Sequence, residues 1–125
     1  MTENEISRIV VDCAFRIHKK LGPGLLESVY EKILIYELKK RKLNLESQVG
    51  IPLVYDEHKF EIGFRADIIV EKKVIIELKS VKELLPVHKK QLLTYLKISN
   101  IKLGLLINFN DALIKNGITR IANNL

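Results

Sequence analysis

The chain has 125 residues, of which 47% are hydrophobic and 29% charged, and its net charge is +6 at pH 7. This length and apolar content predict one domain, residues 1–125, and exclude both a disordered chain and two domains of ordinary size. The single cysteine excludes a disulfide framework and a zinc or iron–sulfur cluster built from this chain's cysteines. The positive charge favours polyanionic partners such as nucleic acids.

No apolar run reaches the roughly 20 residues that span a bilayer. The N-terminal residues MTENEISR lack the basic and then apolar pattern of a signal peptide. We therefore expect a cytoplasmic protein without membrane contact.

Two helices are expected in the first third of the chain. From Glu5 to Leu21 apolar residues recur at steps of three and four, and Gly22 and Pro23 end this helix. A second helix is expected from about Leu25 to Arg41. The residues predicted to be buried on it are Leu26, Val29, Tyr30, Ile33, Leu34 and Leu38.

The periodicity then changes to the alternation that is typical of strands. Two strands, 49–55 and 60–64, are expected to form a hairpin around residues 56–58, followed by strands at 65–70 and 74–81. A third helix is expected from Pro86 to about Ile98, then a buried strand at 102–109 and a closing hairpin or strand around Asn116-Gly117. This order predicts an α/β sandwich with a central mixed β-sheet flanked by helices.

Charged residues interrupt the two most apolar strands, at Asp67, Glu77 and Lys79. If the turn between these strands is centred on Lys72, Asp67 lies opposite Glu77 with Cβ atoms roughly 5 Å apart, and such a like-charge pair destabilises a sheet. A magnesium ion would compensate it, and Lys79 would add a positive charge on the face of Glu77, as metal-assisted phosphodiester hydrolysis requires. The alternative is a salt-bridge ladder on a solvated face, although the isoleucines and valines around these residues favour a partly buried pocket.

Short motifs along the chain resemble those of the PD-(D/E)XK nuclease superfamily. Ala66-Asp67 is similar to the PD element, with alanine in place of proline, and Glu77-Leu78-Lys79 is similar to (D/E)XK. Gly24-Leu-Leu-Glu27-Ser-Val-Tyr30 resembles the signature of the GxxExxY proteins, which are usually placed in that superfamily. Gln91-Leu-Leu-Thr-Tyr95 and Gly63-Phe-Arg-Ala-Asp67 resemble motifs of RecB-like nucleases. The resemblance implies a restriction-endonuclease-like fold.

The resemblance also implies roles for individual residues. The implied metal, Mg²⁺ or alternatively Mn²⁺, would be held by Asp67, Glu77 and the main-chain carbonyl of Leu78. Glu27 would approach the same metal directly or through water. The implied catalytic set is Glu27, Asp67, Glu77, Lys79, Gln91 and Tyr95, in which Lys79 is the catalytic lysine.

The supporting residues have simpler interpretations as well. Glu27 lies in the first turn of its helix, where the dipole favours an acidic side chain by about 0.3 to 1 kcal/mol. Tyr30 lies on the apolar stripe, which favours core packing with a hydroxyl hydrogen bond. Gln91 and Tyr95 are also explained as an i,i+4 pair at a helix edge, although the resemblance places them over the site, holding Lys79 or the DNA backbone.

Basic residues surround the expected mouth of the site. The candidate contacts to a nucleic-acid backbone are Lys82, His88, Lys89 and Lys90. A solvated helix face explains the lysines almost as well. His18 and His58 are expected to be exposed or loop residues.

These patterns together favour a magnesium-dependent nuclease that acts on DNA. The second hypothesis is a nucleic-acid-binding or partner-binding module that retains the fold without cleaving, and the third is a subunit active only in a larger complex. The presence of Asp67, Glu77 and Lys79 together argues against the second. Because so small a domain covers little of a duplex, a homodimer is also an expectation. In addition, either a protein partner supplies targeting or the substrate is recognised by its shape.

Overall fold

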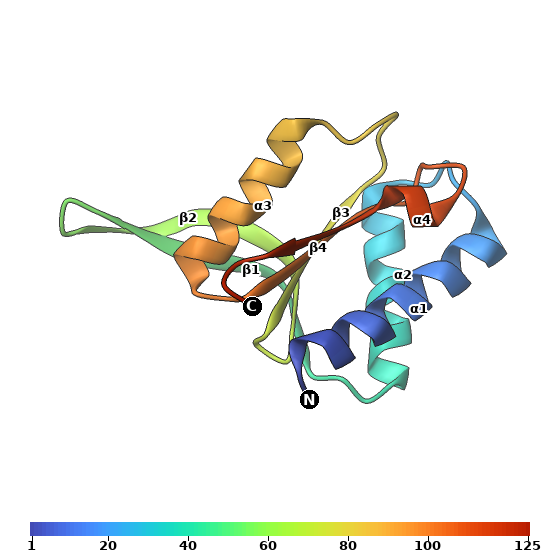
Figure 1. Cartoon of the computed structure of the whole chain (residues 1–125), viewed down its shortest axis with the longest axis horizontal. Coiled ribbons are helices and arrows are strands. Elements are labelled where there is room, and N and C mark those ends of the chain that lie inside the picture. Colours follow the sequence, from blue (N-terminus) through green and yellow to red (C-terminus); the bar gives the residue numbers. More distant parts are fainter.

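A five-stranded sheet with helices on both faces forms the protein (Figure 1). The computed structural model describes residues 1–125, apart from the side chain of Ile62. The strands lie in the order β1-β2-β3-β4-β5, and every neighbouring pair is antiparallel except β3 and β4, which are parallel. The elements are α1 (Glu3–Leu21), α2 (Glu27–Lys40), β1 (Leu45–Tyr55), β2 (His58–Val70), β3 (Val74–Lys79), α3 (Pro86–Ser99), β4 (Leu103–Asn108), α4 (Ile114–Gly117) and β5 (Ile118–Ala122). The predicted α/β class and mixed sheet are confirmed.

Two apolar clusters hold the layers together. In the larger cluster α1 and α2 pack on one face of the sheet, and in the smaller one α3 packs on the other. Nowhere among the described residues does a helix have the length and apolarity needed to cross a membrane.

Capping sets the start of α1 two residues before the predicted position. The Thr2 hydroxyl accepts from the Glu5 N–H and the Thr2 N–H donates to Glu5 Oε1, both at 3.1 Å, which is a capping box. Gly22, with φ of 69°, ends the helix as predicted.

The buried stripe of α2 is narrower than the predicted one. Tyr30, Leu34 and Leu38 are fully buried, whereas Leu26 is 72% exposed and Val29 is 37% exposed. The prediction was wrong for Leu26 and Val29, because α2 begins only after the extended Leu26 and faces the core with its i,i+4 stripe from Tyr30.

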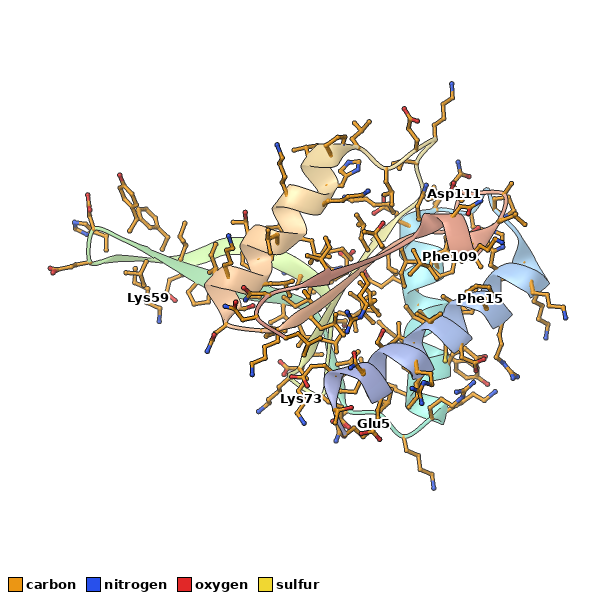
Figure 2. The ribbon with its side chains drawn as sticks, in the orientation of Figure 1. Glu5, Phe15, Lys59, Lys73, Phe109 and Asp111 are labelled. Atoms are coloured by element: carbon orange, nitrogen blue, oxygen red, sulfur yellow. The ribbon has the colours of Figure 1, made fainter. Side chains whose placement is uncertain are left out.

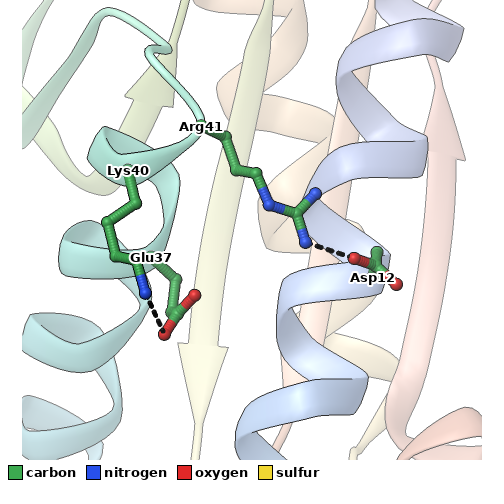
Figure 3. A network of polar contacts seen from close by, with 4 residues as sticks. All are labelled: Asp12, Glu37, Lys40 and Arg41. Atoms are coloured by element: carbon green, nitrogen blue, oxygen red, sulfur yellow. Dashed lines mark hydrogen bonds and ion pairs between the residues drawn. The ribbon is translucent and has the colours of Figure 1, made fainter.

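Polar contacts on the outer surface of α1 and α2 are few. Arg41 pairs with Asp12 between the helices, and Lys40 lies 4.0 Å from Glu37 within α2 (Figure 3). Exposed ion pairs of this kind contribute about 1 kcal/mol or less, so apolar packing holds the two helices in place.

One long strand, β2, replaces the two strands predicted at 60–64 and 65–70. No turn residue separates Phe64 from Arg65, so the chain has no reason to break there. The hairpin turn consists of Asp56 and Glu57, with φ of 50° and 65°, and Tyr55 pairs with His58. Such two-residue turns with positive φ match the twist of the strands. The outer part of the hairpin projects from the body, with Lys59 near its end (Figures 1 and 2).

The hairpin strands change layers at a single row of residues. Ile68 and Val70 belong to the cluster under α1 and α2, whereas Phe64 and Ala66 belong to the cluster under α3. The row is that of Gln48 on β1 and Asp67 on β2. The residues on either side of Gln48 are paired with β2, whereas Gln48 and Asp67 themselves are not, and Gln48 has φ of 52°. The left-handed residue thus marks the point where the ribbon turns over, and Asp67 lies opposite it.

The end of the chain adds one strand to the sheet. Of the two predicted endings, the strand is confirmed as β5, which pairs antiparallel with β4. The hairpin alternative around Asn116-Gly117 was wrong, because these residues form the short helix α4, in which Gly117 is buried.

Candidate metal and catalytic site

The turn between β2 and β3 is centred on Lys72, as predicted. Val70 pairs with Val74, and Ile68 pairs with Ile76. In the next row, the main-chain N–H of Asp67 donates to Glu77 Oε1 at 3.1 Å. In turn, the Leu78 N–H donates to Asp67 Oδ2 at 2.8 Å. Each carboxylate therefore takes a main-chain donor of the neighbouring strand, and the two acids lie side by side.

Glu77 is the buried member of this pair. Its exposed fraction is 9%, and its pKa is raised to about 8, first by burial and then by the charge of Asp67. Without a cation, Glu77 therefore holds a proton at neutral pH, and this proton removes the repulsion between the two acids.

Main-chain geometry adds a third oxygen to the pair. The Lys79 carbonyl accepts from the Phe109 N–H of the segment that follows β4, at 3.0 Å. Because successive carbonyls of a strand point to opposite sides, the Leu78 carbonyl is directed toward β2, as is the Leu78 N–H that donates to Asp67.

These oxygens fit a hard divalent cation. Mg²⁺ binds through one or two carboxylates and keeps several waters. The described residues contain no group of three or more His, Cys, Asp or Glu side chains arranged to hold a metal. A cation here would thus be held by Asp67, Glu77 and the Leu78 carbonyl, with water in the remaining positions.

Lys79 lies on the same face of β3 as Glu77. Its ammonium acts to lower the pKa of Glu77, against the stronger effects of burial and Asp67. Its side chain is half-buried and makes no ion pair among the described residues. The amine beside the acids is therefore free to meet a ligand.

Glu27 is not brought into contact with the two acids. It is the exposed first residue of α2 and lines a surface hollow of about 580 Å³, together with Ser80 and Asn110. The first-turn position that favours an acidic side chain is as predicted, and its approach to a metal through water stays a proposal.

Glu31, one turn further along α2, is linked to the site instead. Gln48 Nε2 donates to Glu31 Oε1 at 2.8 Å and to Asp67 Oδ1 at 3.4 Å. The pKa of Glu31 is raised by burial and by the charge of Asp67. Sequence reasoning missed both Glu31 and Gln48, and the only available signal was the i,i+4 spacing of Glu31 from Glu27.

Tyr30 fixes the loop that leads into α2. Its hydroxyl donates to the Gly22 carbonyl at 2.6 Å and accepts from the Leu25 N–H at 3.2 Å, while its ring stacks on Phe109 with centroids 4.4 Å apart. The interpretation of Tyr30 as a core residue with a hydroxyl hydrogen bond is confirmed. The Gly24–Tyr30 motif therefore has a structural basis in this loop, and Gly24, with φ of 103°, supplies its turn.

Tyr95 of α3 lies near the carboxylate pair. Its ring stacks on Phe64 with centroids 3.7 Å apart, and its pKa is raised by burial and then by the charges of Glu77 and Asp67. Gln91, one turn earlier, is exposed. The structure thus brings Tyr95 to the acids and leaves the Gln91 side chain in solvent.

The basic residues differ in their surroundings. Lys82, Lys89 and Lys90 are exposed. His88 is half-buried, and its Nδ1 accepts from the Leu85 N–H at 3.0 Å, so it caps the start of α3. Contact of these four residues with nucleic acid stays a prediction.

The two remaining histidines were both predicted to be exposed or loop residues. His58 is exposed, as predicted. The prediction for His18 was wrong, because it lies within α1, is only 9% exposed, and has its Nε2 2.8 Å from the Asp111 carbonyl oxygen.

Comparisons with known proteins find a matching family and a similar fold. The family model of the PD-(D/E)XK nuclease superfamily matches residues 4–121. A crystal structure of a protein called SSO0001 is similar, with a TM-score of 0.61 and 26% sequence identity over 79% of this chain and 51% of that chain. The chain thus spans about half the length of that protein. No significant match was found among curated proteins.

Proposed function

Because this chain belongs to the PD-(D/E)XK nuclease superfamily, we propose that it hydrolyses phosphodiester bonds in DNA with the help of Mg²⁺ or Mn²⁺. The observation that carries the proposal is the pairing of Asp67 with Glu77 across β2 and β3, with Lys79 beside them. The second hypothesis, a module that binds nucleic acid or a partner without cleaving, has no comparable observation in its favour.

In this proposal Asp67, Glu77 and the Leu78 carbonyl hold the cation. When bound, the cation supplies Lewis acidity that activates water and offsets charge on the phosphate. Glu77 would hold the cation as a carboxylate, so the proton that it carries without a cation would be released. The Lys79 ammonium faces the phosphate oxygen that gains negative charge during attack, and stabilises it electrostatically.

The surroundings of the acids complete the proposed site. The stacked rings of Tyr95 and Phe64 form an apolar wall that limits water around Glu77. Gln91, exposed one turn before Tyr95, reaches the DNA backbone. Glu27 would approach the cation through water from the hollow that it lines.

We propose that exposed basic residues hold the nucleic acid. Lysines on one surface neutralise phosphates without reading sequence, so they position the backbone over the acids. The residues proposed for this role are Lys82, His88, Lys89 and Lys90. A homodimer would cover more of a duplex, a protein partner would supply targeting, and the protein would act in the cytoplasm.

A cleavage assay tests this function. Labelled double-stranded DNA, single-stranded DNA and RNA are incubated with the protein in Mg²⁺, in Mn²⁺ and in chelator, alongside Asp67→Ala and Lys79→Ala. We expect cleavage of DNA that stops in chelator and in both variants. Cleavage that persists in chelator or in both variants would reject the chemistry, and binding without cleavage under every condition would favour the non-cleaving module.

A further inference from the structure

A buried amide on β4 fixes the chain directly after Lys79. Asn108 is fully buried, and it pairs in register with Lys79 across the parallel strands. The Val81 N–H donates to Asn108 Oδ1 at 3.0 Å, and Asn108 Nδ2 donates to the Val81 carbonyl at 2.9 Å. The side-chain amide thus imitates a strand partner and continues the ladder past the end of β3.

The residues after Asn108 add further bonds to this arrangement. We call the bonded group of Val81, Asn108, Asn110 and Asp111 the Asn108 bracket. Asn108 Nδ2 also donates to Asp111 Oδ2 at 3.0 Å, and Asn108 Oδ1 accepts from the Asn110 N–H at 3.3 Å. Asn110 Nδ2 donates to the Val81 carbonyl at 3.2 Å. Asn108 therefore uses every donor and acceptor of its amide, and a second side chain supports the same carbonyl.

The bracket is itself held from outside. His18 of α1 contacts the Asp111 carbonyl, and a Cβ on Gly117 would lie only 2.3 Å from the Asn108 carbonyl oxygen. Figure 2 shows Phe109 and Asp111 beside α4, away from the projecting hairpin. Tight packing of this kind leaves the bracket little freedom to move.

Lys79 needs such support, because its own side chain makes no ion pair among the described residues. Its main chain is fixed by the bond from the Phe109 N–H. The segment that follows is fixed by the bond from Ser80 Oγ to the Leu25 carbonyl at 2.7 Å and by the Asn108 amide.

We propose that Asn108 is a positioning residue, which acts through Val81 to aim the amine of Lys79 at the phosphate. This inference rests on the proposed nuclease function. A side chain that serves only stability would not change the rate of the chemical step in a folded, metal-loaded enzyme, whereas a small misplacement of a reacting group costs a large factor in rate.

The test compares Asn108→Asp with Asn123→Ala. Asn108→Asp keeps the size of the side chain but loses both bonds donated by Nδ2. Asn123→Ala is the matched control, because Asn123 Nδ2 donates to the Ile101 carbonyl at 3.2 Å near the opposite end of β4. Asn110→Ala, which removes one bond to the Val81 carbonyl from a half-buried side chain, serves as the second variant.

Single-turnover cleavage is measured at saturating Mn²⁺ and DNA, together with the dissociation constants of both. We expect Asn108→Asp to lower the rate by about tenfold or more and Asn110→Ala by about threefold, with both constants within about twofold of wild type. Asn123→Ala should cleave like the wild type. A wild-type rate in Asn110→Ala, or in folded Asn108→Asp, would overturn the proposal.

A second readout separates this proposal from the nuclease proposal. An acylating reagent labels Lys79, and mass spectrometry follows the rate of labelling in the same variants without any substrate. We expect a change of at least threefold in Asn108→Asp and none in Asn123→Ala. If the wild type cleaves none of the substrates, the proposed nuclease function is rejected. The role of Asn108 is rejected separately if the labelling rate of Lys79 is unchanged in Asn108→Asp and Asn110→Ala.

Discussion

The main-chain N–H of Asp67 donates to the Glu77 carboxylate at 3.1 Å, and this bond draws together two acids that would otherwise repel each other. Burial and the charge of Asp67 raise the pKa of Glu77 to about 8. Without a cation, the pair therefore carries one negative charge, on Asp67. When a cation binds, Glu77 loses its proton, and the cation neutralises both carboxylates.

The first prediction concerns stability without metal. The folded protein holds the Glu77 proton more tightly than the unfolded chain, whose glutamates have a pKa of about 4.5. The free energy of unfolding should therefore fall as pH rises from about 4.5 to 8, by up to about 4 kcal/mol. Glu77→Gln should remove most of this slope, and urea denaturation in chelator across this pH range measures it. The exposed control Glu46→Gln should keep the wild-type slope, and an equally steep slope in Glu77→Gln would contradict the assignment.

The second prediction concerns proton release. At pH 7 Glu77 is protonated without metal, and a cation requires its carboxylate, so Mn²⁺ binding should release about one proton. Calorimetric titrations in buffers of different ionisation enthalpy count these protons. The number should fall toward zero in Glu77→Gln and at pH 9. Binding without proton release at pH 7 would show that Glu77 is already ionised.

The third prediction compares two glutamates one turn apart on α2. Glu31 is linked to Asp67 through Gln48, whereas Glu27 is exposed and has no such link. Glu31→Gln should weaken Mn²⁺ binding by about three- to tenfold, because it removes a nearby negative charge, and Glu27→Gln should weaken it less. Calorimetry on both variants provides the comparison. The reverse order would place Glu27 closer to the cation than Glu31.

The fourth prediction concerns the row where the hairpin turns over. Gln48 has φ of 52°, a conformation that costs residues with a Cβ roughly 1 kcal/mol relative to glycine. Gln48→Gly and Gln48→Ala both lose the side-chain bonds, so their difference isolates the backbone. Gln48→Gly should be more stable by about 1 kcal/mol in chemical denaturation. Equal stabilities would show that the chain relaxes to a negative φ at this position.

The fifth prediction tests whether Tyr30 has a structural or a catalytic role. Tyr30→Phe keeps the stacking on Phe109 but leaves the Leu25 N–H and the Gly22 carbonyl without their partner. It should cost about 1 to 3 kcal/mol of stability. Cleavage per folded molecule should stay within about threefold of wild type, as measured at a temperature where both proteins are fully folded. A much larger loss of cleavage at unchanged stability would give Tyr30 a direct role.

The pairing of Asp67 with Glu77 could be predicted because it depends on local information. Two apolar runs flank a short charged turn, and the centre of that turn sets which residues face each other. The class of the fold followed from the change of hydrophobic period along the chain in the same way.

Other parts of the site depend on tertiary contacts that no local pattern records. Glu31 is linked to the site only because the side chain of Gln48, a residue of β1 in a left-handed conformation, reaches it from another element. Asn108 looks like the polar end of an apolar strand, and its partner Val81 lies 27 residues earlier. The Asn116-Gly117 turn signal was overridden because Gly117 packs against the Asn108 carbonyl.

The most direct test of the account is a calorimetric titration of Mn²⁺ into the wild-type protein, Asp67→Asn and the double variant Asp67→Asn/Glu77→Gln. The account predicts one ion per wild-type chain, much weaker binding to Asp67→Asn and none to the double variant, with all three proteins folded. Binding of equal strength and stoichiometry to all three would contradict it, since the cation would then lie elsewhere.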